Sequence, residues 1–381
     1  MNTDSRNQRK PRPTVKGSSP NVRDILDSWS IRRPGYSLPL SLCRYVAALL
    51  SILILLVAVT SVLLIGARDV YFSFPSRPST EESGSGVANN DGERPYADGV
   101  SGNVLLPWAD NVKIIPENSI YASYAALADL ASGEIIASRK ADELIYPASM
   151  TKVMTLIVAV ENLPSEDCLS ELIEVSPEVY EDMKRQGSSG IGLEPGEKLT
   201  VEAMLYALML KSDGIAACEL AKYVAGSIED FVELMNQKAE KMGLTNTHFV
   251  NPTGLFHKEH KTTSREIASI MAYAMKMKLC RKILLTQSYN APCQAADGST
   301  FNYNLYHNLI VTQFENISPN QPTTVTVAAG KTGFTDESRF CLVTYAESAD
   351  GHGYVCVTAK SGSYAECIAD YLTIYNGYVK P

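Results

Sequence analysis

A stretch of 23 residues without a charged side chain divides this chain into two unequal parts. The stretch covers residues 45–67 and lies between Arg44 and Arg68. A helix of this length crosses the hydrocarbon core of a bilayer, which is roughly 30 Å thick. A core helix of a water-soluble domain is rarely so long and so uniformly apolar. We therefore predict a single transmembrane helix at residues 45–67.

The residues before this stretch are basic, which predicts the orientation of the helix. Residues 1–44 contain nine Lys or Arg against three Asp, a net charge of +6, which leaves −14 for the rest of a chain whose total is −8. Positively charged flanks stay on the cytoplasmic side of a membrane. We expect residues 1–44 to be a cytoplasmic tail and residues 68–381 to lie outside. The acidic outer part argues against nucleic acid as a partner.

A cleaved signal peptide is the alternative interpretation of the apolar stretch. Its apolar region would usually have roughly 7–15 residues, behind a short basic segment and before a small-residue cleavage site. Here the basic segment extends over residues 1–44, and no A-x-A sequence occurs in residues 68–112, directly after the apolar stretch. An uncleaved anchor fits these features better.

Residues 68–112 have the composition of a flexible linker. They are rich in Pro, Ser, Gly, Asn and Asp, most clearly at residues 75–86, and they lack apolar periodicity. Globular patterning begins at about residue 113. The predicted organisation is a tail at 1–44, a transmembrane helix at 45–67, a linker at 68–112 and one domain at 113–381.

The eight cysteines do not form a recognisable framework. Cys43 precedes the predicted membrane helix, seven others follow it, and no C-x-x-C occurs. A domain of this size folds without a disulfide framework, so we expect most of these cysteines to be small buried core residues. One or two disulfides remain possible, with no pairing assigned.

Apolar patterns in the outer part predict strands at both ends and helices between them. A hairpin is expected at residues 123–138, and an apolar helix should run from Pro147 to about residue 162. Such an order predicts an α+β domain in which helices flank an antiparallel sheet built from both termini. The remaining predicted helices are at 201–210, from 216, 228–242, 264–279 and 363–377, and the remaining strands are at 323–329, 340–346 and 354–359.

The first residues with evident chemistry are Ser149 and Lys152, which form the one S-x-x-K sequence in the chain. Positions i and i+3 of a helix are neighbours. A serine hydroxyl becomes a useful nucleophile when an adjacent group takes its proton. The spacing alone therefore places a potential base beside a potential nucleophile.

Three further segments, in the same order along the chain, strengthen this pattern. They are Ser212-Asp213-Gly214, Asn251-Pro-Thr-Gly-Leu255 and Gly330-Lys-Thr-Gly-Phe-Thr-Asp-Glu337. Together with Tyr146-Pro-Ala-Ser-Met-Thr-Lys152, they resemble the motifs of low-molecular-mass penicillin-binding proteins. Those proteins are D-alanyl-D-alanine carboxypeptidases with the serine β-lactamase fold. The resemblance covers roughly residues 115–378.

The resemblance implies catalytic roles for three residues. Ser149 would attack the carbonyl between the two terminal D-alanines of a peptidoglycan stem peptide. Lys152 would take the proton of the serine, which requires burial and the neighbouring cationic Lys331 to depress its pKa from about 10.4. Ser212 would relay a proton to the departing D-alanine.

The resemblance also implies how the substrate is held. Lys331 and Thr332 would bind the carboxylate of the peptide or of a penicillin, and Gly333 would let the substrate backbone pass close to the strand. The backbone N–H groups of Ser149 and Phe334 would form the oxyanion hole. No cofactor or metal is implied. The expected partners are the stem peptide, β-lactams as covalent inhibitors and the bacterial cell membrane through the N-terminal helix.

One departure from the family pattern leaves the outcome open. The middle motif of the family is usually S-x-N, but its third position is Gly214 here. The alternatives are a membrane-tethered penicillin-binding protein with little turnover and a β-lactamase-like hydrolase. A zinc site at His257 and His260 is a weaker hypothesis, because no third ligand is nearby in the sequence.

Overall fold

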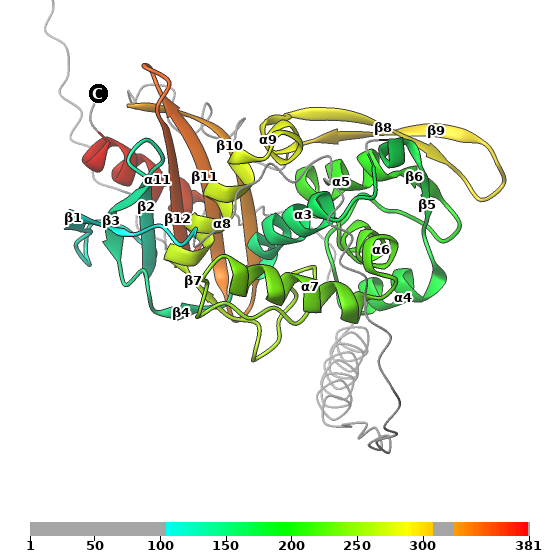
Figure 1. Cartoon of the computed structure of the whole chain (residues 1–381), viewed down its shortest axis with the longest axis horizontal. Coiled ribbons are helices and arrows are strands. Elements are labelled where there is room, and N and C mark those ends of the chain that lie inside the picture. The colour runs from blue at the N-terminus through cyan, green and yellow to red at the C-terminus, as the bar shows by residue number, and fades with distance from the viewer. Residues whose placement is uncertain (1–103, 166, 308–323, 380–381) are drawn as a thin grey trace, which may run out of the picture. The chain divides into compact units, whose positions relative to one another are not determined.

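The computed structural model describes residues 104–165, 167–307 and 324–379 (Figure 1). The predicted cytoplasmic tail and transmembrane helix, and the predicted linker as far as residue 103, lie outside the described residues. Among the residues that are described, no helix is long and apolar enough to cross a membrane.

A six-stranded sheet forms the centre of the domain. Its strand order is β1-β3-β2-β12-β11-β10. All neighbouring strands are antiparallel except β1, which pairs in parallel with β3. The prediction of an antiparallel sheet is therefore wrong at one edge, and the sheet is mixed. The strands are β1 (Trp108–Ile114), β2 (Tyr124–Asp129), β3 (Glu134–Arg139), β10 (Val325–Thr335), β11 (Arg339–Ser348) and β12 (Gly353–Ser361).

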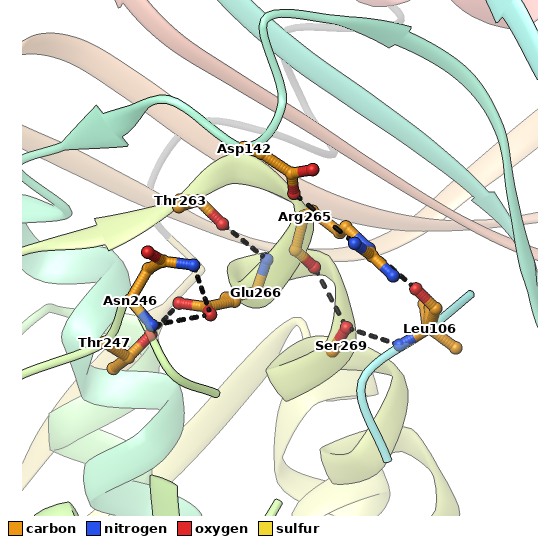
Figure 2. Close-up of polar contacts among 8 residues, drawn as sticks. All are labelled: Leu106, Asp142, Asn246, Thr247, Thr263, Arg265, Glu266 and Ser269. Atoms are coloured by element: carbon orange, nitrogen blue, oxygen red, sulfur yellow. Dashed lines mark hydrogen bonds and ion pairs between the residues drawn. The ribbon is translucent and has the colours of Figure 1, made fainter. Parts of the chain in front are cut away.

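Most of strand β1 lies in the segment at 68–112 that the sequence assigned to the linker. Most of its side chains are exposed or half-buried, so it carries no apolar alternation that would distinguish it from a linker. The residues just before it are anchored on helix α8 (Ser264–Lys276) by two hydrogen bonds, from Leu106 N to Ser269 Oγ at 3.0 Å and from Arg265 Nε to Leu106 O at 2.8 Å (Figure 2). The folded domain thus begins before residue 113.

Helices cover both faces of the sheet. Helix α11 (Tyr364–Tyr378) packs on one face, where the Tyr371 hydroxyl donates to Leu342 O at 2.6 Å. Helices α3 and α8 belong to the larger core on the other face, which contains most of the apolar side chains of the domain (Figure 1). The further helices are α3 (Lys152–Glu161), α4 (Pro177–Arg185), α5 (Val201–Leu210), α6 (Gly214–Ala225), α7 (Ile228–Lys241) and α9 (Lys278–Leu285), with 3₁₀ turns η2 (Ala148–Thr151) and η3 (Asp167–Ser170).

Two of the predicted helices are each divided into two segments. The segment from Pro147 begins as the 3₁₀ turn η2 and becomes α-helical at Lys152. The segment at 264–279 is interrupted at Met277, whose extended backbone separates α8 from α9. The backbone conformation of a single residue, Met277, causes the second break, and Met277 is neither a Gly nor a Pro that would signal a break.

A second sheet and helix α4 are additional to the predicted elements. The second sheet has the order β5-β6-β8-β9, and its β8–β9 hairpin is the long yellow ribbon of Figure 1. A two-stranded sheet pairs β4 with β7. The strands are β4 (Leu144–Ile145), β5 (Leu172–Glu174), β6 (Lys198–Thr200), β7 (Thr262–Thr263), β8 (Ser288–Gln294) and β9 (Thr300–Tyr306).

The cysteines fill space in the cores. All seven cysteines after the predicted membrane helix are buried and unbridged, which confirms the expectation of core residues. Burial raises the pKa of Cys341 to about 12 and that of Cys293 to about 11. Thiols with such pKa values stay protonated and inert at neutral pH.

Candidate active site

The side chains of Ser149 and Lys152 meet at the start of the central helix. Ser149 is half-buried in η2, and Lys152 is the first residue of α3. Lys152 Nζ lies 3.1 Å from Ser149 Oγ. The helix continues into the apolar core, where nine of its ten side chains are buried. This packing fixes the position of the lysine because α3 cannot shift without disturbing the core.

The Lys152 amine is enclosed and partly neutralised. Only 1% of the residue is exposed, and Nζ also donates to Thr253 O at 2.6 Å. Burial lowers the pKa of Lys152 to about 8, against the opposing attraction of Asp213 and Cys218. A depressed pKa is what the family resemblance requires of a lysine base. Burial accounts for it here, and the expected contribution of Lys331 is not among its causes.

Ser212 and Lys331 form a second pair. Lys331 lies on β10 and donates through Nζ to Ser212 Oγ and to Thr332 O, each at 2.9 Å. Ser212 has a φ of +57° in the short connection between α5 and α6, a strained conformation for a residue with a Cβ. Burial lowers the pKa of Lys331 well below its usual value, and the charge of Lys152 lowers it further.

Gly333 brings strand β10 against the turn that holds the nucleophile. A Cβ at Gly333 would lie 2.9 Å from Pro147 O and 3.1 Å from Ser149 N. Gly254, with a φ of +79°, also packs against this turn, where a Cβ would lie 1.9 Å from Ala148 O. Two glycines therefore contact the peptide before Ser149, and each allows a backbone approach that alanine would block.

The other two predicted residues of β10 lie on either side of this glycine. Thr332 is half-buried, whereas the Phe334 ring is 44% exposed and packs against Phe340. Because Gly333 contacts the Ser149 backbone, the next residue, Phe334, is also close to the nucleophile turn. The structure thus brings all the predicted site residues to one region, at the junction of η2, β10 and the α5–α6 connection.

Asp213 is a site residue whose role sequence reasoning missed. It caps helix α6, with Oδ1 accepting from Ala216 N at 2.9 Å, and its Oδ2 accepts from Ile191 N at 2.7 Å. The carboxyl is fully buried, and burial raises its pKa against the effect of these hydrogen bonds. An Asp directly before a helix is a recognisable capping signal, but its link to residue 191 depends on the tertiary fold.

His260 connects the nucleophile turn to the loop that binds Lys152. Its Nε2 lies 2.9 Å from Thr151 Oγ1, and its Nδ1 accepts from Val250 N at 3.3 Å. Because Nδ1 is an acceptor, the proton of the neutral ring is on Nε2 and is donated to Thr151. Burial lowers the pKa of His260 to about 3, so the ring stays neutral over the physiological range.

The zinc hypothesis for His257 and His260 gains no support from the structure. In the part of the chain that is described, no group of three or more His, Cys, Asp or Glu side chains could hold a metal ion. Both nitrogens of His260 are already used, and His257 Nδ1 accepts from Glu259 N at 3.2 Å.

The arrangement has the parts of an acyl-transfer centre. A hydroxyl lies beside a lysine with a depressed pKa, and a second hydroxyl lies beside a second lysine. Neighbouring buried amines repel each other, so one of the two readily remains neutral as a base while the other is cationic. The cationic amine favours a substrate that carries a carboxylate.

Comparison with known proteins agrees with this chemistry. A family model described as D-alanyl-D-alanine carboxypeptidase matches residues 111–358. The D-alanyl-D-alanine carboxypeptidase DacF of Bacillus subtilis (strain 168) is 30% identical over 241 residues, which cover 63% of this chain and 58% of DacF. The carboxypeptidase DacC of Escherichia coli (strain K12) is 37% identical over 153 residues, which cover 39% of this chain and 38% of DacC. The chain thus spans less than two thirds of the length of either relative.

A solved structure gives the same fold. The Streptomyces K15 DD-transpeptidase superposes with a TM-score of 0.62 and is 25% identical in sequence. The match covers 69% of this chain and 98% of the transpeptidase. The α+β architecture is therefore that of a DD-transpeptidase.

Proposed function

The chain belongs to the D-alanyl-D-alanine carboxypeptidase family, and we propose that it is a serine carboxypeptidase which removes the terminal D-alanine from peptidoglycan stem peptides. The observation that carries the proposal is the pairing of Ser149 Oγ with Lys152 Nζ at 3.1 Å, where burial lowers the pKa of the lysine to about 8. Such a pair generates the nucleophile without a histidine or a metal.

Acylation begins with proton transfer from Ser149 Oγ to the neutral Lys152 amine. The serine oxygen attacks the carbonyl carbon of the peptide bond between the two D-alanines, and a tetrahedral oxyanion forms. The bond from this carbon to nitrogen then breaks, and the proton taken up by Lys152 passes through Ser212 Oγ to the departing D-alanine amine, which leaves Lys152 neutral again. Ser212 is suited to this relay because its Oγ accepts a hydrogen bond from Lys331 Nζ at 2.9 Å.

Substrate binding also prepares the base. The free carboxylate of the terminal D-alanine is placed at Lys331 and Thr332. An opposite charge raises the pKa of an amine, so the carboxylate favours the cationic form of Lys331. A cationic Lys331 in turn favours a neutral Lys152. A substrate with the correct terminal charge thus promotes the protonation states that acylation requires.

The backbone N–H groups of Ser149 and Phe334 are proposed to hold the oxyanion. The close approach of Gly333 to Ser149 N, with only 3.1 Å from the position of a Cβ to that nitrogen, supports the assignment. In a comparable hydrolase, loss of one such donor lowers kcat by about 10²–10³. The proposed steps use side chains and backbone groups of the protein and require no metal or cofactor.

Water completes the peptide reaction: the neutral Lys152 amine takes a proton from the attacking water, whose oxygen bonds to the acyl carbon, and passes that proton to Ser149 Oγ as the acyl group leaves. A penicillin acylates the same serine, but opening of its lactam ring leaves the amine attached to the acyl group. We therefore propose that penicillins are covalent inhibitors of this protein. Rapid hydrolysis of the penicillin would instead identify a β-lactamase-like hydrolase.

The cellular setting is a further part of the proposal. Residues 45–67 would anchor the protein in the bacterial cell membrane, with residues 1–44 inside and the domain outside. The uncharged length of the stretch and the +6 charge of the preceding residues support this orientation. The linker would let the domain reach wall peptides.

The test is release of D-alanine from diacetyl-L-lysyl-D-alanyl-D-alanine by the full chain, with Ser149→Ala as the control. We expect the wild-type protein to release D-alanine and Ser149→Ala to release none. Absence of release from a folded wild-type protein would overturn the carboxypeptidase proposal. Covalent capture of penicillin without D-alanine release would indicate a membrane-tethered binding protein in place of an enzyme.

A further inference from the structure

The space beside Gly214 is occupied by a side chain from another element. A Cβ at position 214 would lie 1.9 Å from Ser188 Oγ, 2.9 Å from Ser188 Cβ and 3.1 Å from Met183 Sδ. Contacts this short cannot occur, so no side chain fits at position 214 unless Ser188 moves. Gly214 is two residues after Ser212, and its missing side chain is therefore replaced in space by that of Ser188.

The segment that carries Ser188 is fixed on the α5–α6 connection. Gly214 N donates to Ser189 O at 2.9 Å, and Ile191 N donates to Asp213 Oδ2 at 2.7 Å. A Cβ at Gly190 would lie 2.7 Å from Asp213 Oδ2, so the backbone passes directly over this carboxylate. These contacts fix Ser188 next to Gly214 by hydrogen bonds and close packing.

An apolar cluster lies next to Gly214 and Ser188. Met183 Sδ contacts Cys218 Sγ at 3.8 Å, and the cluster of Val179, Met183 and Cys218 also includes Leu255. Ser188 thus places a hydroxyl beside an apolar cluster that includes Leu255, from the loop whose Thr253 O accepts from Lys152 Nζ.

The Ser188 hydroxyl is weakly engaged within the protein. Its one hydrogen bond in the described residues is to Ser189 O, at 3.3 Å, which is long for a bond from a hydroxyl. The residue is half-buried. A half-buried hydroxyl with a long hydrogen bond can donate to a ligand and accept from it without losing a strong internal partner.

We propose that Ser188 is a substrate-binding residue, whose hydroxyl forms a hydrogen bond with a backbone amide of the bound peptide on the acyl side of the scissile bond. The inference rests on the proposed function, because it assumes a peptide substrate in this site. Ser188 lies in the segment after α4, and its side chain occupies the space that a side chain at position 214 would fill.

The first test is Ser188→Ala, with Ser189→Ala as the matched control on the same segment. Loss of one neutral hydrogen bond predicts a kcat/KM for D-alanine release about three- to tenfold lower in Ser188→Ala. Ser189→Ala should retain the wild-type value, because only its backbone oxygen makes contacts with Gly214. A kcat/KM for folded Ser188→Ala within twofold of wild type would overturn the proposal.

The second test exchanges the two positions. Gly214→Asn alone should reduce kcat/KM at least tenfold, because its side chain meets Ser188 Oγ. Ser188→Gly combined with Gly214→Asn removes this clash and restores an amide at the same place, so activity should recover at least fivefold relative to Gly214→Asn. Absence of recovery in the folded double variant would contradict the shared position.

The two tests remain informative if the carboxypeptidase proposal fails. The carboxypeptidase proposal fails if the folded wild-type protein releases no D-alanine. In that case the second-order rate of acylation by benzylpenicillin, which also has an amide on its acyl side, replaces kcat/KM in the same comparisons. A Ser188→Ala rate equal to that of wild type would then overturn the role of Ser188 independently.

Discussion

Lys331 Nζ lies 2.9 Å from Ser212 Oγ, although the two residues are 119 positions apart in the sequence. Lys331 is on the edge strand of the six-stranded sheet, and Ser212 is between two helices. The contact therefore joins the sheet to the helical side of the domain. The Ser149–Lys152 pair, which begins the central helix, lies at the same junction.

The titration of Lys152 predicts a pH dependence of turnover. Only the neutral amine accepts the serine proton, and its pKa is lowered to about 8. At peptide concentrations well below KM, where the rate reports the free enzyme, it should therefore rise about tenfold per pH unit below this pKa and level off above it. A series of D-alanine release rates from pH 6 to 9.5 measures this. A rate that is constant between pH 6 and 8 would contradict Lys152 as the base.

Gly333→Ala should disable the site while leaving the fold intact. The new Cβ would lie 2.9 Å from Pro147 O and 3.1 Å from Ser149 N, so β10 and the nucleophile turn must move apart. We expect acylation by benzylpenicillin to slow about 10²-fold, as for the loss of an oxyanion donor. Gly377→Ala is the control, because nothing lies within 4 Å of its Cβ position. Equal acylation rates for the two variants would be inconsistent with this packing.

His260→Phe should change how folding stability depends on pH. The folded-state pKa of His260 is about 3, below its usual 6.5. Between these two values the unfolded chain binds the proton and the folded protein does not, so the contribution of His260 is present above pH 6.5 and is lost as pH falls toward 3.

The measurement for His260 is the free energy of urea unfolding of wild type and His260→Phe at several pH values. At neutral pH the variant should lose about 1–3 kcal/mol, because Thr151 and Val250 lose a buried partner. The difference between the two proteins should shrink as the pH falls from 6.5 toward 3. A difference that stays constant over this range would show that His260 is not held neutral.

Glu266→Gln should lower the stability of the folded domain by weakening hydrogen bonds at the N-terminal turn of helix α8. The buried carboxylate accepts from Asn246 N at 2.9 Å and from Thr247 Oγ1 at 2.6 Å (Figure 2). Exchange for a neutral amide should cost about 1.5–3 kcal/mol of unfolding free energy, the usual contribution of a hydrogen bond to a charged group. Glu259→Gln, at an exposed position, is the control. Equal unfolding midpoints in urea would contradict a stabilising role for this network.

The sequence named most residues of the candidate site, which the structure brings to one region, but it did not predict most of their contacts. Ser149 and Lys152 are three positions apart, so local geometry alone predicts their proximity. The contact between Ser212 and Lys331 depends on how the sheet packs on the helices, and only resemblance to a family could suggest it. The asparagine missing at position 214 was visible, but its replacement in space was not.

The parts of the fold that escaped prediction share a physical cause. Strand β1 is mostly exposed and has no alternating pattern, and the segment carrying Ser188 is polar and rich in glycine. Such segments take their conformation from tertiary contacts, as in the hydrogen bond between Ile191 N and Asp213 Oδ2. Strongly apolar elements, such as α3 and α5, were predicted close to their observed bounds because burial alone determines them.

The central claim, that Ser149 is the residue which becomes acylated, is tested most directly by incubating the full chain with benzylpenicillin and locating the adduct by mass spectrometry of its peptides. We predict one penicillin per chain, on the hydroxyl of Ser149, and no adduct in a folded Ser149→Ala variant. An adduct on another residue, or an unmodified wild-type protein that is fully folded, would contradict the account.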